Sequence, residues 1–404
     1  MNFKREFGVW AFLASAALVL LVAILLWQEQ IIRRRPITYM APKPVEGGFV
    51  FREKGCASCH GNNASGGNAP SLRGREALSS LAQLITAMWN HAPRMWEAME
   101  ERKVGYPSLS YEETGQLVSY LYFSRYADSS GDAEHGRVLF TAKHCVLCHS
   151  VKGVGGTRAK DLANAHSVEN PIAWTQALWN HASKMQVALD HDGLRWPKFE
   201  ADEMRDLFAY VRQSSGYSGT EFPFPATDPD AGWKVFQAKG CIHCHSLSDS
   251  VSSGGPTLGG GHSLPPSFSE LGAEMLNHLP KMRKMMDARG QAVPTFEERE
   301  MSDLFGFIYG LHYVEPSGVA SVGESVFAWR GCAECHGAHA DGRRTGPPLR
   351  GQGQTYTATR LATDLWRHGG RMYQESRNAD RPWPMLQDGD IGNLLAFLNS
   401  PQSR

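Results

Sequence analysis

The stretch Cys56-Ala57-Ser58-Cys59-His60 is the first of four copies of one pentapeptide pattern in this chain. The other copies are Cys145-Val146-Leu147-Cys148-His149, Cys241-Ile242-His243-Cys244-His245 and Cys332-Ala333-Glu334-Cys335-His336. The chain has eight cysteines, so the four copies use all of them and leave none for a structural disulfide. A pattern that takes up every cysteine decides the chemistry of the chain.

Cys-x-x-Cys-His is the spacing of c-type haem attachment. Two thiols three positions apart can each form a thioether with one haem vinyl group, and the adjacent histidine then lies below the iron as its proximal ligand. We therefore predict four covalently bound haem c groups with iron, ligated by His60, His149, His245 and His336. A zinc site would pair two Cys-x-x-Cys motifs, and a redox dithiol does not need the histidine, so both alternatives fit poorly.

The composition excludes one class of function. The 404 residues are 42% hydrophobic and 20% charged, which is ordinary for a globular protein. Basic and acidic residues number 41 each, and the formal net charge is zero. Nucleic-acid binding usually needs a basic excess, so we expect no nucleic-acid partner. Local charged patches for docking a redox protein remain compatible with a balanced total.

Residues 7–27, with the sequence FGVWAFLASAALVLLVAILLW, form an uncharged run of 21 residues. A helix of about 20 apolar residues can cross a bilayer, and Trp10 and Trp27 lie where interfacial aromatic residues are expected. No clear small-residue cleavage site follows this run. We therefore interpret residues 1–28 as an uncleaved transmembrane signal anchor and residues 29–44 as a linker.

The first cysteines of the four motifs lie 89, 96 and 91 residues apart, a spacing that indicates an internal repeat. Each motif is preceded by a short helical segment that ends in phenylalanine. We expect this ring to pack against the haem or against the last helix of the repeat. The four segments are Gly48-Phe49-Val50-Phe51, Gly136-Arg137-Val138-Leu139-Phe140, Gly232-Trp233-Lys234-Val235-Phe236 and Gly323-Glu324-Ser325-Val326-Phe327.

Two further elements follow each motif. A glycine-rich loop contains Pro-x-Leu at Pro70, Pro256 and Pro347, whereas the second repeat has Lys160 in place of the proline. A predicted helix then ends in an Asn/Arg-His-x-x-x-Met box. The boxes are Asn90-His91-Ala92-Pro93-Arg94-Met95, Asn180-His181-Ala182-Ser183-Lys184-Met185, Asn277-His278-Leu279-Pro280-Lys281-Met282 and Arg367-His368-Gly369-Gly370-Arg371-Met372.

Each repeat ends with an amphipathic helix, which follows a short proline segment. The four proline segments contain Pro107, Pro197, Pro294 and Pro384. In the first repeat, Leu117, Tyr120 and Leu121 show the i, i+3, i+4 stripe of a helix that buries one face. We interpret these stripes as core packing. The matching sets are Leu207, Tyr210, Val211; Leu304, Phe307, Ile308; and Leu394, Phe397, Leu398.

From about residue 45 onward, each repeat resembles a class I cytochrome c domain in the order of its helices, haem motif, Pro-x-Leu loop and methionine. The resemblance implies a mainly α fold of four tandem cytochrome c-like domains, which follow the one N-terminal transmembrane helix predicted from residues 7–27. The implied domains are residues 45–127, 128–216, 217–314 and 315–404. The whole resembles a membrane-anchored tetrahaem c-type cytochrome.

The resemblance also implies a distal methionine ligand, aligned with Met95, Met185, Met282 and Met372. In the family this methionine is usually followed by proline, whereas Met95 is followed by Trp96, so the residues up to the later proline would be an insertion. The offsets from proximal histidine to methionine, 35, 36, 37 and 36 residues, favour a shared role. An open site and a histidine ligand remain alternatives. The competing histidines are His91, His181, His278 and His368.

A filled sixth position favours an electron carrier over an enzyme, because it blocks substrate and oxygen. We expect transfer from a quinol-linked membrane donor to a periplasmic or surface acceptor, with redox proteins or a respiratory complex as partners. Arg33, Arg34 and Arg35 follow the anchor, but long domains cross a membrane largely regardless of such charge. The resemblance places the haem domains on the periplasmic side of the cytoplasmic membrane.

Two alternatives remain at this point. One is an oxidoreductase with an open-site haem, for which the second repeat is the first candidate because it lacks the loop proline. The other is a haem-carrying subunit that conducts electrons within a larger respiratory or photosynthetic complex.

Overall fold

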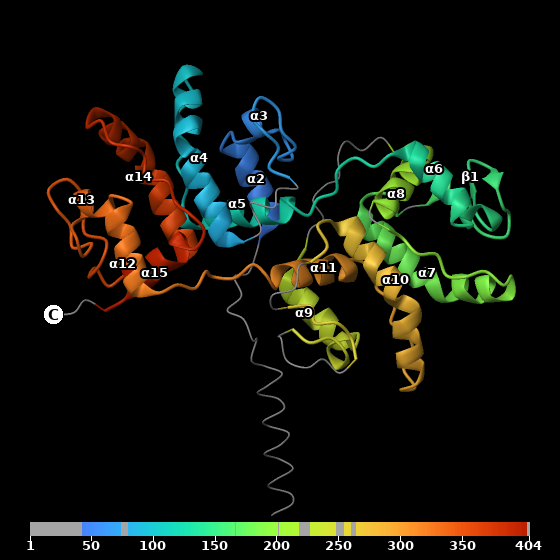
Figure 1. The fold of residues 1–404 in the computed structure, drawn as a ribbon. Coiled ribbons are helices and arrows are strands. Elements are labelled where there is room, and N and C mark those ends of the chain that lie inside the picture. The colour runs from blue at the N-terminus through green and yellow to red at the C-terminus, as the bar shows by residue number, and fades with distance from the viewer. Residues whose placement is uncertain are drawn as a thin grey trace, which may run out of the picture. The chain divides into compact units, whose positions relative to one another are not determined.

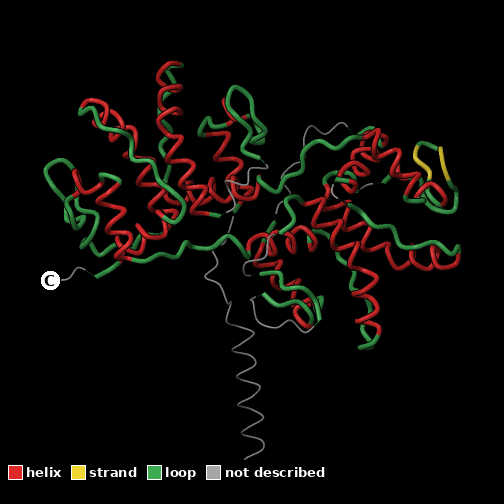
Figure 2. Tube along the Cα trace, in the orientation of Figure 1, coloured by secondary structure: helices red, strands yellow, loops and turns green. Residues whose placement is uncertain are grey.

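The computed structural model describes residues 43–73, 80–165, 167–200, 202–217, 227–247, 254–259 and 264–401. These residues are mainly helical, with one short antiparallel ribbon formed by β1 (Ser150–Val151) and β2 (Val154–Gly155) (Figure 2). The predicted membrane segment, residues 7–27, lies outside the described residues. Within the described part, no helix is long and apolar enough to cross a membrane.

Each repeat contains a short first helix, a long middle helix and a last helix, with the haem motif between the first two (Figure 1). Short helical turns carry the motifs: α3 (Ala57–His60), η2 (Cys145–Leu147), η4 (Cys241–His243) and α13 (Cys332–His336), and η3 (Leu162–Asn164) follows the second. The three main helices of repeats one to four are, in order, α2 (Pro44–Glu53), α4 (Leu81–Glu101) and α5 (Tyr111–Ser124); α6 (Ala133–Ala142), α7 (Pro171–His191) and α8 (Glu203–Ser214); α9 (Pro229–Ala238), α10 (Phe268–Asp287) and α11 (Glu300–Gly310); and α12 (Ala320–Trp329), α14 (Ala358–Asn378) and α15 (Asp390–Asn399).

The first and last helices of each repeat cross at a glycine. A Cβ atom on Gly47 would lie 1.9 Å from the carbonyl oxygen of Gln116 in α5, far inside van der Waals contact. A Cβ atom on the equivalent glycine of the other repeats would come within 2.0 Å of a carbonyl oxygen of the last helix; these glycines are Gly136, Gly232 and Gly323. Because glycine lacks the Cβ, the two backbones can touch. In the first repeat the glycine at the helix crossing is therefore Gly47, one residue before the Gly48 that the sequence pattern indicated.

The phenylalanine that ends each first helix packs against an aromatic residue of the last helix. The ring of Phe51 lies 5.2 Å from that of Tyr120, and the equivalent pairs lie 5.4–5.7 Å apart. All four phenylalanines are 1–3% exposed. The sequence predicted that this phenylalanine packs against the haem or against the last helix, and the contact with the last helix is confirmed. The predicted core role of the stripe that includes Tyr120 is confirmed as well.

The long helices associate in two pairs that the order of the chain does not suggest. Helix α4 packs against α14, so repeat one contacts repeat four, and α7 packs against α10, so repeat two contacts repeat three (Figure 1). We call repeats one and four the outer pair and repeats two and three the inner pair. In both pairs, the long helix of one repeat holds the proline segment of its partner.

The asparagine of the box makes this contact in the inner pair. The Nδ2 of Asn180 donates to the carbonyl of Phe296 at 2.7 Å, and the amide of Phe296 donates back to Oδ1 at 2.8 Å. Asn277 and Phe199 form the reciprocal pair at 2.7 and 2.8 Å. The side chain of asparagine therefore satisfies both backbone groups of a residue in the partner repeat, as a strand neighbour would.

The outer pair uses the same contact on one side only. Asn90 exchanges two hydrogen bonds with the backbone of Leu386, both at 2.8 Å. On the other side, Arg367 replaces the asparagine and donates a single bond from Nε to the carbonyl of Leu109 at 2.7 Å. The box residue thus stabilises the contact between repeats in all four copies.

Prolines inside two of the long helices are matched to tryptophans in the partner repeats. Pro93 has no N–H, so it leaves the carbonyl of Trp89 without its helical partner. The indole of Trp383 donates to that carbonyl at 3.3 Å. The inner pair repeats the arrangement at 2.9 Å, with Pro280, the carbonyl of Leu276 and the indole of Trp196.

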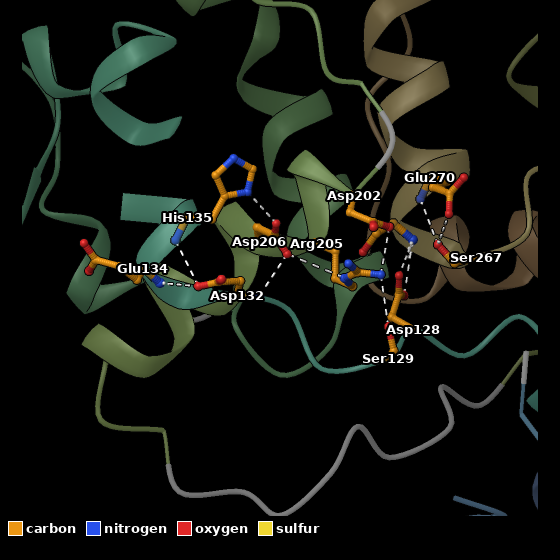
Figure 3. A network of polar contacts seen from close by, with 11 residues as sticks. Asp128, Ser129, Asp132, Glu134, His135, Asp202, Arg205, Asp206, Ser267 and Glu270 are labelled. Atoms are coloured by element: carbon orange, nitrogen blue, oxygen red, sulfur yellow. Dashed lines mark hydrogen bonds and ion pairs between the residues drawn. The ribbon is translucent and has the colours of Figure 1, made fainter. Parts of the chain in front are cut away.

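The two pairs meet near the end of α5. The hydroxyl of Tyr122 in repeat one donates to the carbonyl of Tyr309 in repeat three at 3.1 Å. Just after α5, buried Asp128 accepts from the amide of Ser269 in repeat three at 3.2 Å. Asp128 lies in a polar network with Ser129 and Arg205 (Figure 3). Burial raises the pKa of Asp128 to about 6, even though hydrogen bonds from serines and the charge of Arg205 oppose this shift.

Candidate haem sites

A residue with left-handed backbone leads into each haem motif. The φ angle is 80° at Gly55, 75° at Gly240 and 81° at Gly331. In the second repeat the position is taken by His144 at 64°, a conformation that costs more for a residue with a side chain. This turn ends the first helix and starts the short helical turn that carries the cysteines.

The proximal histidines share one contact in all four repeats. The Nδ1 atom of His60 lies 3.1 Å from the carbonyl oxygen of Pro70. The other three histidines make the same contact at 2.9 Å, to the carbonyls of Lys160, Pro256 and Pro347. A carbonyl can only accept, so we assign the proton to Nδ1, which leaves the Nε2 lone pair free for a metal. A contact of this kind orients a ligating histidine and raises its basicity.

The second repeat keeps this contact without its proline. The carbonyl of Lys160 replaces that of Pro70, because the interaction needs only a backbone oxygen. The next residue, Asp161, fixes the loop by accepting from the amide of Gly153 at 2.7 Å and from the hydroxyl of Ser150 at 2.9 Å. The feature that singled out this repeat in the sequence therefore does not alter the orientation of His149.

No disulfide joins the eight cysteines, all of which are described, and their sulfur atoms stand for the thioether sulfurs of attached haem. Beside the second cysteine lies the end of the long helix. The Nη1 atom of Arg102 lies 3.2 Å from the sulfur of Cys59, and that of Arg289 lies 3.0 Å from the sulfur of Cys244. A guanidinium at this edge favours the less positive ferrous state.

The His-x-x-x-Met boxes lie on the long helices, and in the second repeat the box faces the proximal histidine. The ring centroids of His149 and His181 are 6.1 Å apart, with the planes at 69°. Partial burial and the charges of His149 and Lys184 lower the pKa of His181. In the third repeat, burial and then the charge of His278 lower the pKa of His245, against a backbone contact that raises it.

The candidate methionine ligands stay predictions. All four are partly buried on the same long helices, one turn after the box histidine: Met95, Met185, Met282 and Met372. Histidine and methionine four residues apart share one helix face, so one of them excludes the other at the iron.

A basic residue two positions before the first cysteine was missed in the sequence. The Nζ atom of Lys54 lies 2.7 Å from Glu113, at the start of the last helix, and donates to the carbonyl of Ser108 at 2.9 Å. The same ion pair occurs in every repeat, as Lys143–Glu203, Lys239–Glu300 and Arg330–Asp390. The constant position of the basic residue was the available signal. It holds the proline segment and the last helix against the haem motif.

Four helical units, each with an oriented histidine behind two cysteines, define a multihaem c-type cytochrome. The cytochrome c family profile matches the chain four times, over residues 45–122, 133–215, 229–311 and 320–402. These matches cover more than half of the chain, which therefore belongs to the cytochrome c family. No curated protein and no solved structure matches the chain.

The family membership confirms the predicted resemblance to four cytochrome c-like repeats and the predicted cofactor. The protein carries four covalently attached haem c groups with iron, and it is a multihaem electron-transfer protein. The described residues confirm the mainly helical fold of the four repeats.

Proposed function

We propose that this cytochrome carries electrons from a quinol-linked donor in the cytoplasmic membrane to a periplasmic or surface acceptor. The observation that supports the carrier role is repeated four times. In each repeat a loop carbonyl orients the proximal histidine. The long helix of the repeat carries a histidine and a methionine, and either of them could be the sixth ligand of the iron. With both axial positions filled, the iron exchanges electrons but binds no substrate.

Bound haem supplies reversible one-electron chemistry between ferric and ferrous iron. We assign the thioether links to the eight motif cysteines and the proximal bonds to His60, His149, His245 and His336. The box supplies the sixth ligand, for which Met95, Met185, Met282 and Met372 are the family-based candidates and the box histidines compete. Arg102 and Arg289 contribute positive charge beside the second cysteine of their motifs.

The proposed location and partners rest on the sequence. Residues 7–27 would hold the chain to the membrane, and the haem domains would lie on the periplasmic side, where the donor is a quinol-oxidising complex. Redox partners would dock reversibly through small, partly polar surfaces of weak affinity. No nucleic acid is expected to bind.

A carbon monoxide difference spectrum of the fully reduced tetrahaem protein tests the carrier role. We expect no carbon monoxide to bind, because both axial positions of each iron are occupied. Binding at one haem of the four would overturn the pure carrier role and favour an oxidoreductase with one open site.

The donor is tested separately, with membranes that contain the full chain. A quinol analogue should reduce the haems, and an inhibitor of the quinol-oxidising complex should stop the reduction. Haems that stay oxidised when quinol is added would contradict the proposed donor. Copurification of a stable set of further subunits would instead favour a role inside a larger complex.

A further inference from the structure

The second repeat brings two imidazole rings into a defined position. His149 ends the haem motif and His181 lies in the middle of α7, and the centroids of their rings are 6.1 Å apart. The Nδ1 atom of His149 is occupied by the carbonyl of Lys160, so its metal-binding Nε2 lies on the opposite side of the ring.

This separation matches two imidazoles on opposite sides of one metal ion. Metal–imidazole bonds in zinc sites are about 2.0–2.1 Å, and a ring nitrogen lies about 1.1 Å from the ring centre, so trans imidazoles have centroids roughly 6.3 Å apart. The rings are also turned by 69°, so they are not stacked on each other.

Met185 lies one turn further along the same helix. It lies four residues after His181 on the same face of α7, which is about 6 Å further along the axis. For the backbone of Met185 to take the place of that of His181, α7 would have to shift by about one turn.

Contacts on both sides of the box fix the position of α7. Next to His181, Asn180 exchanges two hydrogen bonds with the backbone of Phe296, and the indole of Trp179 donates to the carbonyl of Pro294 at 2.7 Å. At the other end, Arg158 forms an ion pair with Asp192 at 2.6 Å. A shift by one turn would break all of these contacts.

We propose that His181, and not Met185, is the sixth ligand of the second haem, which is then a bis-histidine haem. The inference rests on the proposed carrier function, since it places a second protein ligand on that iron. Histidine in place of methionine lowers the reduction potential, so the second haem becomes more reducing than a His/Met haem of the same chain. The site is also closed, which removes the second repeat as the candidate open site.

Substitutions in the full tetrahaem protein test this assignment, with haem content checked for each variant. His181→Leu should make one haem of the four bind carbon monoxide, and Met185→Leu should bind none. In the oxidised protein, Met185→Leu should leave the sulfur-to-iron(III) charge-transfer band unchanged, and His181→Met should increase it. His191→Met, a change of the same type near the end of α7, is the matched control and should change neither signal.

The reverse pattern would overturn the proposal. If Met185→Leu opens one haem and weakens the charge-transfer band, while His181→Leu does neither, methionine is the ligand. If the His181→Leu variant loses its haem, the His181→Met variant decides between the two ligands. An unchanged charge-transfer band in His181→Met would contradict the proposal, because a methionine that ligates the iron from position 181 must increase this band. These outcomes differ from a failure of the carrier role, which is read from carbon monoxide binding by the unsubstituted protein.

Discussion

The outer and inner pairs use one backbone arrangement with different side chains. In the inner pair, Asn180 and Asn277 make the same two hydrogen bonds to the partner repeat. In the outer pair, Asn90 keeps both bonds, whereas Arg367 makes one. The outer pair has an aromatic cluster instead, in which buried Trp96 packs on aromatic residues of repeat four.

The difference shows which part of the contact is needed and which part can vary. Holding the proline segment of the partner is common to all four repeats, so a side chain that bonds its backbone is needed in each. How the remaining surface is filled differs, since the position of Trp96 in α4 corresponds to Gln186 in α7. The outer pair should therefore depend on apolar packing and the inner pair on hydrogen bonds.

The largest expected effect is that of Trp96→Ala. Trp96 is 1% exposed and contacts the rings of Trp366, Tyr373 and Trp383. Large-to-small changes at such sites cost about 3–5 kcal/mol. Hydrogen exchange with mass spectrometry should show faster exchange in α4 and α14 and none of this change in α7 and α10. Gln186→Ala is the matched control and should have little effect; equal losses from both variants would contradict the comparison.

Asp128→Asn should stabilise the contact between repeats two and three in a pH-dependent way. Burial raises the pKa of Asp128 to about 6 from a usual value of about 3.9, so the folded state binds its proton more tightly than the unfolded state. The stability that this proton provides is complete below pH about 3.9 and is lost as the pH rises through about 6. Asparagine stays neutral, so the variant should be more stable at pH 7 by up to about 3 kcal/mol.

Urea unfolding at pH 4 and pH 7 measures this effect, which should be near zero at the lower pH. Asp161→Asn is a control that should lower the stability at pH 7, whereas Asp128→Asn should raise it. Hydrogen bonds from the amides of Gly153 and Ala163 and from Ser150 lower the pKa of Asp161, so its charge stabilises the fold at neutral pH. A pH-independent effect of Asp128→Asn would show that Asp128 is already ionised without cost.

Asn180→Ala should weaken the inner pair by about 2–3 kcal/mol, because it leaves the amide and the carbonyl of Phe296 without partners. Arg367→Ala in the outer pair should cost less, since one hydrogen bond is lost there. Asn180→Asp should fall between the two, because a carboxylate can accept from the amide but cannot donate to the carbonyl. Urea midpoints rank the three variants, and an equal cost for Asn180→Ala and Arg367→Ala would contradict the ranking.

The sequence was sufficient for most of what lies within one repeat, although the ion pair of Lys54 with Glu113 was missed. The haem motifs, the helix order and the buried stripes could be predicted because each depends on residues close together in the chain or on a fixed period. The box asparagine was visible in the sequence only as part of a repeated motif. Its contact with a residue of another repeat, about 300 positions away for Asn90, was not visible from spacing alone.

The pairing of repeats did leave a signal in the sequence. Repeats one and three have proline in the box, at Pro93 and Pro280, and their partners four and two have tryptophan before the later proline. Repeats two and four have Ser183 and Gly370 at the box position, and their partners lack this tryptophan. This match is physical, because a helix proline frees a carbonyl that an indole N–H can bond. It could not be recognised before the donor and acceptor were seen together.

The smallest expected effect tests that match directly. Trp196→Phe removes the indole N–H that bonds the carbonyl of Leu276 and should cost about 1–2 kcal/mol, while most of the apolar contact remains. Trp383→Phe should cost less, because its hydrogen bond is longer, 3.3 Å against 2.9 Å. Both costs are read from urea midpoints of the holoprotein.

A double-mutant cycle separates the lost hydrogen bond from the lost ring. Pro280→Ala restores a backbone N–H four residues after Leu276, so the helix itself can bond the freed carbonyl. In that background Trp196→Phe should cost clearly less than in the unsubstituted chain, because the carbonyl is no longer left without a partner. If the cost is the same in both backgrounds, the tryptophan acts only by packing, and the match of proline to tryptophan does not explain the pairing.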